Sequence, residues 1–210
     1  MARMLSLVER VYLEARFRLL GVGKTYTASL WDREFASGKW ESMDGEIHSM
    51  RQTVLAALVQ RYAPPGRMIL EVGCGTAMLA RHLPAERARD YVGLDVSAVA
   101  LALARSRAPA AAQFVQASAE PAPREALQGL APFGAIVFNE VLFYFRDPVE
   151  TILSYRELLA PDGYLVLSIW NTRRSYVMRR RVLRRLTVAS LVTVGPRLPS
   201  DIIVAAFPTT

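Results

Sequence analysis

Short apolar runs recur along much of the chain and predict buried strands. The first run, Met68 to Val72, is interrupted only by Glu71 and leads into a glycine turn. A second run, Tyr91 to Leu94, follows one helix-length later. Apolar runs without polar alternation are typical of parallel strands that helices cover on both faces. Residues 76–83 have helical spacing, so the pattern predicts a strand, a tight turn and a helix in succession.

Helical periodicity dominates the part of the chain before these strands. Residues 4–20 place apolar side chains at helical spacing with Arg10, Arg16 and Arg18 between them, which predicts an amphipathic helix. That helix either packs on the rest of the protein or contacts a membrane surface or a second copy. Another helix is predicted at residues 47–62. We therefore expect a helical and lid segment at residues 1–62, followed by one α/β domain at residues 63–210.

The C-terminal third of the chain predicts a helix and a closing hairpin. Residues 149–159 have helical character, and Asp147-Pro148 places an N-cap aspartate and a first-turn proline before them. Residues 188–194 and 202–207 are two apolar runs separated by a segment that contains glycine and proline. This arrangement predicts a terminal antiparallel hairpin.

The turn after the first strand carries the most specific chemistry. Its sequence is Glu71-Val72-Gly73-Cys74-Gly75-Thr76-Ala77, in which both glycines permit positive φ and let a ligand approach the backbone. Asp95 ends the second apolar run, where an acidic side chain can accept both hydroxyls of a ribose. A dinucleotide-binding turn would require glycine at the position of Met78. The pattern therefore favours an adenosyl ligand without a pyrophosphate.

At this point the chain resembles the class I S-adenosylmethionine-dependent methyltransferases. Their first motif reads acidic-x-Gly-x-Gly-x-Gly, and Ala77 stands here in place of the last glycine. The resemblance continues in order through residues 114–120, 133–140 and 158–167. It implies a Rossmann-like α/β fold: a mostly parallel seven-stranded sheet with a C-terminal antiparallel hairpin, helices on both faces and an N-terminal helical lid.

The resemblance also implies a cofactor and its contacts. The cofactor would be S-adenosylmethionine, with S-adenosylhomocysteine as the product. Ser118 stands where the family often carries an aspartate that contacts the adenine. The residues implied to bind the cofactor are Glu71, Gly73, Cys74, Gly75, Asp95, Val96, Ser118, Ala119 and Asn139.

The acceptor site is predicted from polar and aromatic side chains near the strand ends. Trp31, Phe35, Trp40 and Met43 suit a lid, where Trp31 and Trp40 could contact the acceptor or simply pack. His48 is a candidate base, because a neutral imidazole near pH 7 can accept a proton, and a surface or structural histidine is the alternative. Glu140 and Tyr144 follow the fourth strand and are the other candidate catalytic residues, with helix capping and core packing as their alternatives.

Charge and composition limit the kinds of ligand and partner that the protein is expected to bind. The formal net charge is +7, and seven arginines lie between Arg173 and Arg185. Most of them suit a solvated helix face, whereas Arg173 and Arg174 follow the fifth strand and could hold an anionic group of the acceptor. Neither an RNA-binding motif nor an aromatic-basic repeat indicates nucleic acid. The cysteine and histidine positions have no metal-ligand spacing, so no metal site is expected.

Two further features exclude other classes of protein. The sequence Gly21-Val22-Gly23-Lys24-Thr25 superficially resembles a phosphate-binding loop, but it follows a predicted helix and has Arg18 where that loop needs glycine. No apolar run reaches the roughly 18 residues needed to span a bilayer. The lone Cys74 excludes internal disulfides and suits a reducing cytoplasm.

These observations predict a methyltransferase that acts on an oxygen or nitrogen atom of a small molecule, in secondary or saccharide metabolism. One alternative is a nicotinamide-dependent oxidoreductase, which Met78 and the terminal hairpin disfavour. The other is a non-catalytic protein that binds S-adenosylmethionine. Such a protein would keep Glu71, Gly73 and Asp95 but would lack a working acceptor pocket.

Overall fold

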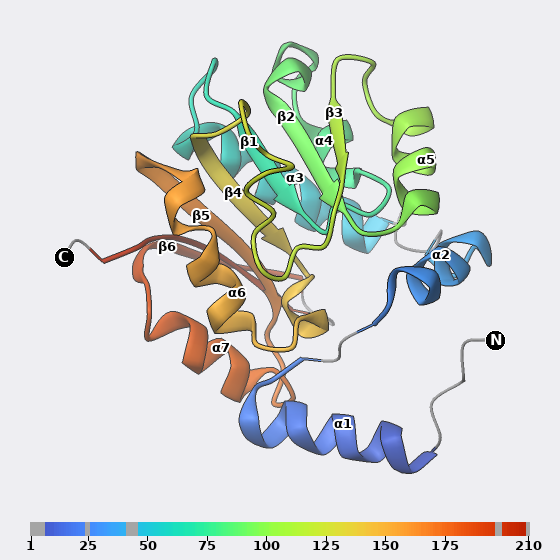
Figure 1. Cartoon of the computed structure of the whole chain (residues 1–210). Coiled ribbons are helices and arrows are strands. Elements are labelled where there is room, and N and C mark those ends of the chain that lie inside the picture. The colour runs from blue at the N-terminus through green and yellow to red at the C-terminus, as the bar shows by residue number, and fades with distance from the viewer. Residues whose placement is uncertain (1–6, 24–25, 41–45, 196–198, 209–210) are drawn as a thin grey trace.

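A seven-stranded sheet forms the centre of the protein in the computed structural model, which describes residues 7–23, 26–40, 46–195 and 199–208 (Figure 1). The strand order is β3-β2-β1-β4-β5-β7-β6. The five strands from β3 to β5 are parallel, and β7 runs antiparallel to both β5 and β6. The strands are β1 (Ile69–Val72), β2 (Tyr91–Asp95), β3 (Gln113–Gln116), β4 (Phe133–Asn139), β5 (Leu159–Trp170), β6 (Thr187–Val194) and β7 (Ser200–Ala206). The predicted fold, including its terminal hairpin, is confirmed.

Helices cover both faces of this sheet, as the uninterrupted burial of the central strands requires. On one face, α6 (Pro148–Ser154) and α7 (Tyr176–Leu183) pack their apolar residues against Leu70, Phe138 and Leu167. On the other face, α3 (Glu46–Tyr62), α4 (Met78–His82) and α5 (Ala98–Arg107) meet Ile69, Val137 and their neighbours. Figure 1 shows α6 and α7 in front of the sheet and α3 behind it.

Two helices are shorter than their patterns predicted. The helix expected at residues 76–83 begins only at Met78, because Ala77 adopts a left-handed φ of 56°. The helix expected at residues 149–159 begins as predicted, with the Asp147 side chain accepting from the backbone N–H groups of Val149 and Glu150. It ends at Ser154, and a 3₁₀ turn at Arg156–Leu158 completes the segment.

The N-terminal part adds α1 (Leu7–Leu20) and α2 (Ala28–Ala36) to the domain. Helix α1 lies beside α7 (Figure 1), and its Phe17 is buried in the same apolar cluster as Met178 and Val182. This side of α1 therefore packs on the protein. Val11 and Leu19, by contrast, are 62% and 74% exposed.

The segment Gly21-Val22-Gly23 follows α1 and passes very close to the backbone of residues 143–145. A Cβ atom on Gly23 would lie 2.1 Å from the carbonyl oxygen of Phe145 and 2.6 Å from that of Phe143. The element before this segment is a helix, as expected, so it cannot form a strand-to-helix phosphate loop. Residues 24 and 25, and Met43 of the predicted lid, lie outside the described residues.

Candidate active site

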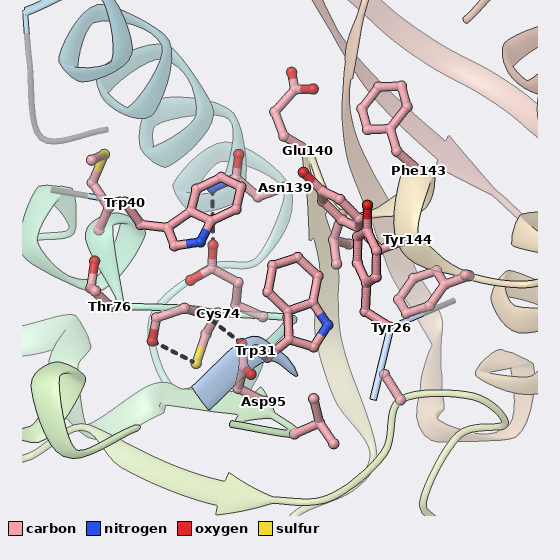
Figure 2. A pocket seen from close by; sticks show the side chains of 18 of the residues that line it. Tyr26, Trp31, Trp40, Cys74, Thr76, Asp95, Asn139, Glu140, Phe143 and Tyr144 are labelled. Atoms are coloured by element: carbon pink, nitrogen blue, oxygen red, sulfur yellow. Dashed lines mark hydrogen bonds between the residues drawn. The ribbon is translucent and has the colours of Figure 1, made fainter. Parts of the chain in front are cut away.

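A cavity of about 260 Å³ opens beside the carboxyl ends of β1, β2 and β4. Open parallel sheets hold their ligands at this edge. The turn after β1 and Asp95 form one side of the cavity, and Asn139 at the end of β4 and Glu140 after it form another (Figure 2). Aromatic side chains from the N-terminal segment complete the wall, so residues far apart in the sequence share one site.

The glycine turn leaves no room for a larger residue at its first position. Gly73 has a φ of 68°, and a Cβ atom there would lie 2.4 Å from Cγ2 of Val141. The carbonyl oxygen of Leu94 in β2 accepts hydrogen bonds from the N–H groups of Gly73 and Cys74, at 2.7 and 3.0 Å. The turn is thereby fixed against the neighbouring strand, with its backbone facing the cavity.

Asp95 is held in one orientation by the backbone. Its two carboxylate oxygens accept from the N–H groups of Gly75 and Ser97, each at 2.9 Å. Burial raises the pKa of this carboxyl, and these hydrogen bonds oppose the rise. Each carboxylate oxygen can accept more than one hydrogen bond, so Asp95 keeps acceptor capacity for hydroxyl groups in the cavity.

A buried polar network that includes Arg51 also borders the cavity. Nη1 of Arg51 lies 3.0 Å from Oδ1 of Asn139 and 3.3 Å from Oε1 of Glu140. Nδ2 of Asn139 donates to Oε1 of Glu71 at 3.0 Å and to Gln52 at 3.1 Å. Arg51 is only 4% exposed and is the single lysine or arginine among the described residues that line this cavity. It is not among the site residues predicted from the sequence.

Burial dominates the electrostatics of this network. It raises the pKa of Glu71 to about 7, although hydrogen bonds from Tyr91 and Asn139 and the charge of Arg51 favour the carboxylate. Burial also raises the pKa of Glu140 and lowers that of Arg51. Glu71, which lies just before the glycine turn, therefore changes its charge near neutral pH.

Glu140 lies in the cavity wall, but its carboxylate is already bonded to the protein. Oε1 accepts from the hydroxyl of Ser168 at 2.8 Å, and Oε2 accepts from the backbone N–H of Trp170 at 3.0 Å. With Arg51 also beside it, the carboxylate joins α3, β4 and β5. This arrangement suits a positioning role better than direct contact with an acceptor.

His48 and Tyr144 differ in their relation to the cavity. His48 is half-buried beside it, with Nδ1 3.5 Å from Nη2 of Arg51, and is not one of the lining residues. Burial, followed by the charge of Arg51, lowers the pKa of His48. Tyr144 lines the cavity, where burial raises its pKa to about 12. Its phenol is therefore a hydrogen-bond donor at neutral pH.

Three aromatic rings of the predicted lid pack together over the cavity. The ring centroids of Trp31 and Trp40 are 5.8 Å apart, and Trp31 meets Tyr144 edge-on at 4.8 Å. Phe35 joins the same group. Helix α2, which carries Trp31 and Phe35, is attached to the start of α5, because Asp32 accepts hydrogen bonds from the hydroxyl of Ser97 and the N–H of Val99.

The structure places the other predicted site residues as follows. Cys74, Val96, Ser118 and Ala119 line the cavity. Burial raises the pKa of the Cys74 thiol well above its usual value, so this side chain is uncharged and suits packing. Arg173 is exposed and lies outside the cavity wall, whereas Arg174 forms an ion pair with Glu14 and lines a neighbouring cavity.

Among the described helices, none combines the length and the apolar character that a membrane span requires. Within the described part of the chain, no group of three or more histidine, cysteine, aspartate or glutamate side chains could hold a metal ion.

Known proteins match this chain in sequence and in fold. A family model described as "Methyltransferase domain" matches residues 47–194. Among curated proteins, a ubiquinone biosynthesis O-methyltransferase of Aliivibrio fischeri (strain MJ11) is 27% identical over 152 residues, which are 69% of this chain and 63% of the relative. The chain thus spans about three fifths of the length of the curated relatives that it matches.

Solved structures of low sequence identity share the fold. One is the N-methyltransferase NodS from Bradyrhizobium japonicum in complex with S-adenosylhomocysteine, with a TM-score of 0.66 at 21% identity over 87% of this chain and 98% of that chain. Another is 1,6-didemethyltoxoflavin-N1-methyltransferase from Burkholderia thailandensis, with a TM-score of 0.67 at 15% identity over 100% of this chain and 93% of that chain.

Proposed function

Since the chain belongs to the methyltransferase-domain family, we propose that it transfers a methyl group from S-adenosylmethionine to an oxygen or nitrogen atom of a small molecule. The observation that carries this proposal is the cavity itself, which joins the glycine turn and Asp95 to an aromatic lid. In this proposal residues 63–210 form the catalytic domain and residues 1–62 supply the lid. The names of the relatives, which include both O- and N-methyltransferases, support the acceptor atoms.

The residues of the cavity fit the proposed cofactor. Gly73, Cys74 and Gly75 all line the cavity, so the turn is open to a ligand there. Asp95 would accept the ribose hydroxyls, and Ser118 and Ala119 lie where an adenine could be contacted. Arg51 would attract the carboxylate of the methionine part, while Glu71 would attract its ammonium group. S-adenosylmethionine supplies an activated methyl group, which leaves its sulfonium sulfur as the acceptor atom forms the new bond.

The chain's own contribution would be alignment and exclusion of water. Trp31, Trp40 and Tyr144 would hold an acceptor against the cofactor, and their rings would attract a sulfonium charge. Glu140 would keep Arg51 and the end of β5 in place. Such alignment can supply about 7 to 11 kcal/mol of a reaction barrier. In this proposal a general base would assist the transfer, but the transfer would not depend on it.

Mass spectrometry tests the proposed activity. The protein is incubated with S-adenosylmethionine and a metabolite extract, and products are sought that gain one methyl group. Label from S-[methyl-¹³C]adenosylmethionine should appear in the product together with S-adenosylhomocysteine. A nicotinamide-dependent enzyme would instead bind NAD and ignore the labelled compound. Tight cofactor binding with no methylated product in a broad acceptor screen would favour a non-catalytic binding protein.

Asp95→Ala is expected to lower the affinity for S-adenosylmethionine by about 10- to 100-fold, since charged hydrogen bonds contribute roughly 1.5 to 3 kcal/mol. Calorimetry on the folded variant measures the effect. Because Asp95 also bonds the turn backbone, Asp95→Asn serves as a second variant that keeps one acceptor oxygen. Its affinity should lie between those of the wild type and the alanine variant. An unchanged dissociation constant in both variants would contradict the ribose assignment.

The affinity for S-adenosylmethionine should rise by about 5- to 10-fold between about pH 6 and pH 8. Burial raises the pKa of Glu71 to about 7, so its carboxyl is mostly neutral below that pH and ionised above it. Only the ionised form attracts the cationic ligand. Titrations at several pH values measure this dependence, and Glu71→Gln should flatten it. A wild-type affinity that stays constant over this range would rule out Glu71 as the titrating group.

If His48 is the base, His48→Ala should lower turnover by about 100-fold or more while cofactor affinity stays unchanged. The activity should also lose the acid limb of its pH profile. The structure favours a smaller effect, because His48 faces Arg51 and lies outside the cavity lining. Measurement of turnover from pH 5.5 to 9 decides between these outcomes. Near-normal turnover would assign His48 to the support of Arg51.

A further inference from the structure

A second cavity of about 190 Å³ adjoins the first and is not explained by the cofactor. Four aromatic residues line both cavities: Tyr26, Phe143, Tyr144 and Trp170. Beyond them, the second cavity is lined by Phe17 of α1 and by Thr172 and Arg174 after β5. We call it the outer cavity. Its position makes it an extension of the proposed transfer site toward α1.

The walls of the outer cavity suit a flat, apolar ligand. The ring of Phe143 lies 5.6 Å from that of Phe17 and 6.1 Å from that of Trp170, measured between centroids. Trp170 is 37% exposed at the end of β5, so part of a large apolar ring faces solvent. At these distances Phe143 contacts both other rings, so the three form one continuous aromatic wall, against which an aromatic guest can pack.

Arg174 is the one charged residue among the described residues that line the outer cavity. Arg174 forms an ion pair with Glu14, and its guanidinium lies 5.8 Å from the centre of the Phe17 ring. Glu14 also pairs with Arg18, at 2.8 Å. Arg174 therefore shares the Glu14 carboxylate with a second guanidinium, so this carboxylate neutralises Arg174 only in part. A guanidinium with spare donors binds carboxylate, sulfonate or phosphate groups well.

We propose that the outer cavity binds the end of the acceptor that lies away from the methylated atom. The acceptor would then be an aromatic molecule with an anionic group at that end. Its ring system would lie against the wall formed by Phe143, Trp170 and Phe17, and its anionic group would meet Arg174. This inference rests on the proposed methyl transfer, because it treats the first cavity as the place where the reacting end lies.

Fluorescence of a bound probe tests the outer cavity without knowledge of the natural acceptor. The probe is 1-anilinonaphthalene-8-sulfonate, which combines aromatic rings with an anionic group. It is titrated into the protein with S-adenosylhomocysteine present at saturation, so that the cofactor part of the first cavity is filled. N-phenyl-1-naphthylamine, which has the same rings without the sulfonate, is titrated in parallel.

Two variants and two controls give the expected pattern. Thr172→Trp should fill the outer cavity and weaken sulfonate-probe binding by about 10-fold or more. Arg174→Gln should weaken it by about 5-fold while it leaves the neutral probe unaffected. The controls Thr187→Trp and Arg184→Gln make the same changes at exposed positions outside the lining of either cavity. Both should bind the probes like the wild type, and thermal unfolding confirms that each variant is folded.

The outcomes separate this inference from the proposed function. Equal binding of the sulfonate probe by Thr172→Trp and the wild type, or no binding by the wild type, would overturn the outer-cavity proposal. Equal affinity of the wild type for the two probes would overturn its anionic part. The affinity for S-adenosylhomocysteine should be unchanged in every variant. Failure of the wild type to bind S-adenosylhomocysteine would overturn the proposed function instead.

Discussion

A Gly73→Val variant should fold and yet lose S-adenosylmethionine binding by at least about 100-fold, which corresponds to about 2.7 kcal/mol. Gly73 has a φ of 68°, which a β-branched residue resists, and its first side-chain atom would overlap Val141. Val141 itself lines the cavity, so relief of the overlap would displace the wall that faces the ligand. Calorimetric titration with S-adenosylmethionine measures the loss.

Gly129→Val is the matched control for this substitution. Gly129 has a similar φ of 82°, but a Cβ atom there would meet nothing within 4 Å. Both variants therefore carry backbone strain, while only the change at Gly73 blocks the cavity. We expect both variants to lose thermal stability, Gly73→Val more because of its overlap with Val141, and only Gly73→Val to lose affinity. Unchanged affinity in a folded Gly73→Val protein would remove the glycine turn from the cofactor site.

The second large effect is expected from Arg51→Met. Removal of one partner from a buried ion pair typically costs about 3 to 5 kcal/mol, because the remaining charge stays buried without compensation. The side chains of Arg51 and Glu140 are 5% and 8% exposed, and Glu71 belongs to the same network. The variant should therefore unfold at a clearly lower urea concentration. It should also bind S-adenosylmethionine weakly, because the cavity loses its guanidinium.

The pH dependence and a double variant isolate the cause. Without Arg51, the pKa of Glu140 in the folded state rises further above its unfolded value, so the folded protein holds this proton more tightly. The loss of stability should accordingly be smallest at acid pH and grow as pH rises through that raised pKa. The double variant Arg51→Met/Glu140→Gln should recover much of the stability but not the cofactor affinity. A pH-independent loss that the second change does not relieve would contradict an electrostatic origin.

The strands and the glycine turn could be predicted from the sequence because their signals are local. The central strands β1, β2 and β4 coincide with short apolar runs, and the two glycines of the turn stand within a few residues of Glu71. Asp95 could be predicted for the same reason, since it ends its own strand. A parallel sheet brings the carboxyl ends of its strands to one edge. Residues that end different strands can therefore be assigned to one site from local patterns alone.

Arg51 could not be predicted in this way, since 88 residues separate it from Asn139, its partner in the cavity. In the sequence it resembles any arginine of a helix. One signal was present: Arg51 stands four and eight residues before Leu55 and Val59, on the apolar side of α3. A charge in such a stripe requires a buried partner. The chemistry of an imidazole predicts His48 as the base, but it is Arg51, on the next turn of the same helix, that lines the cavity.

The tight passage at Gly23 bears on how this protein could be re-engineered. Its α-carbon leaves no space for a side chain against the carbonyl groups of Phe143 and Phe145, which flank Tyr144 on both sides. A transplanted N-terminal segment with alanine at this position would displace the loop of residues 143–145. The wall that the two cavities share would move with this loop. Chimeras that exchange the lid to change acceptor preference therefore need to retain glycine at position 23, or to exchange residues 141–146 together with the lid.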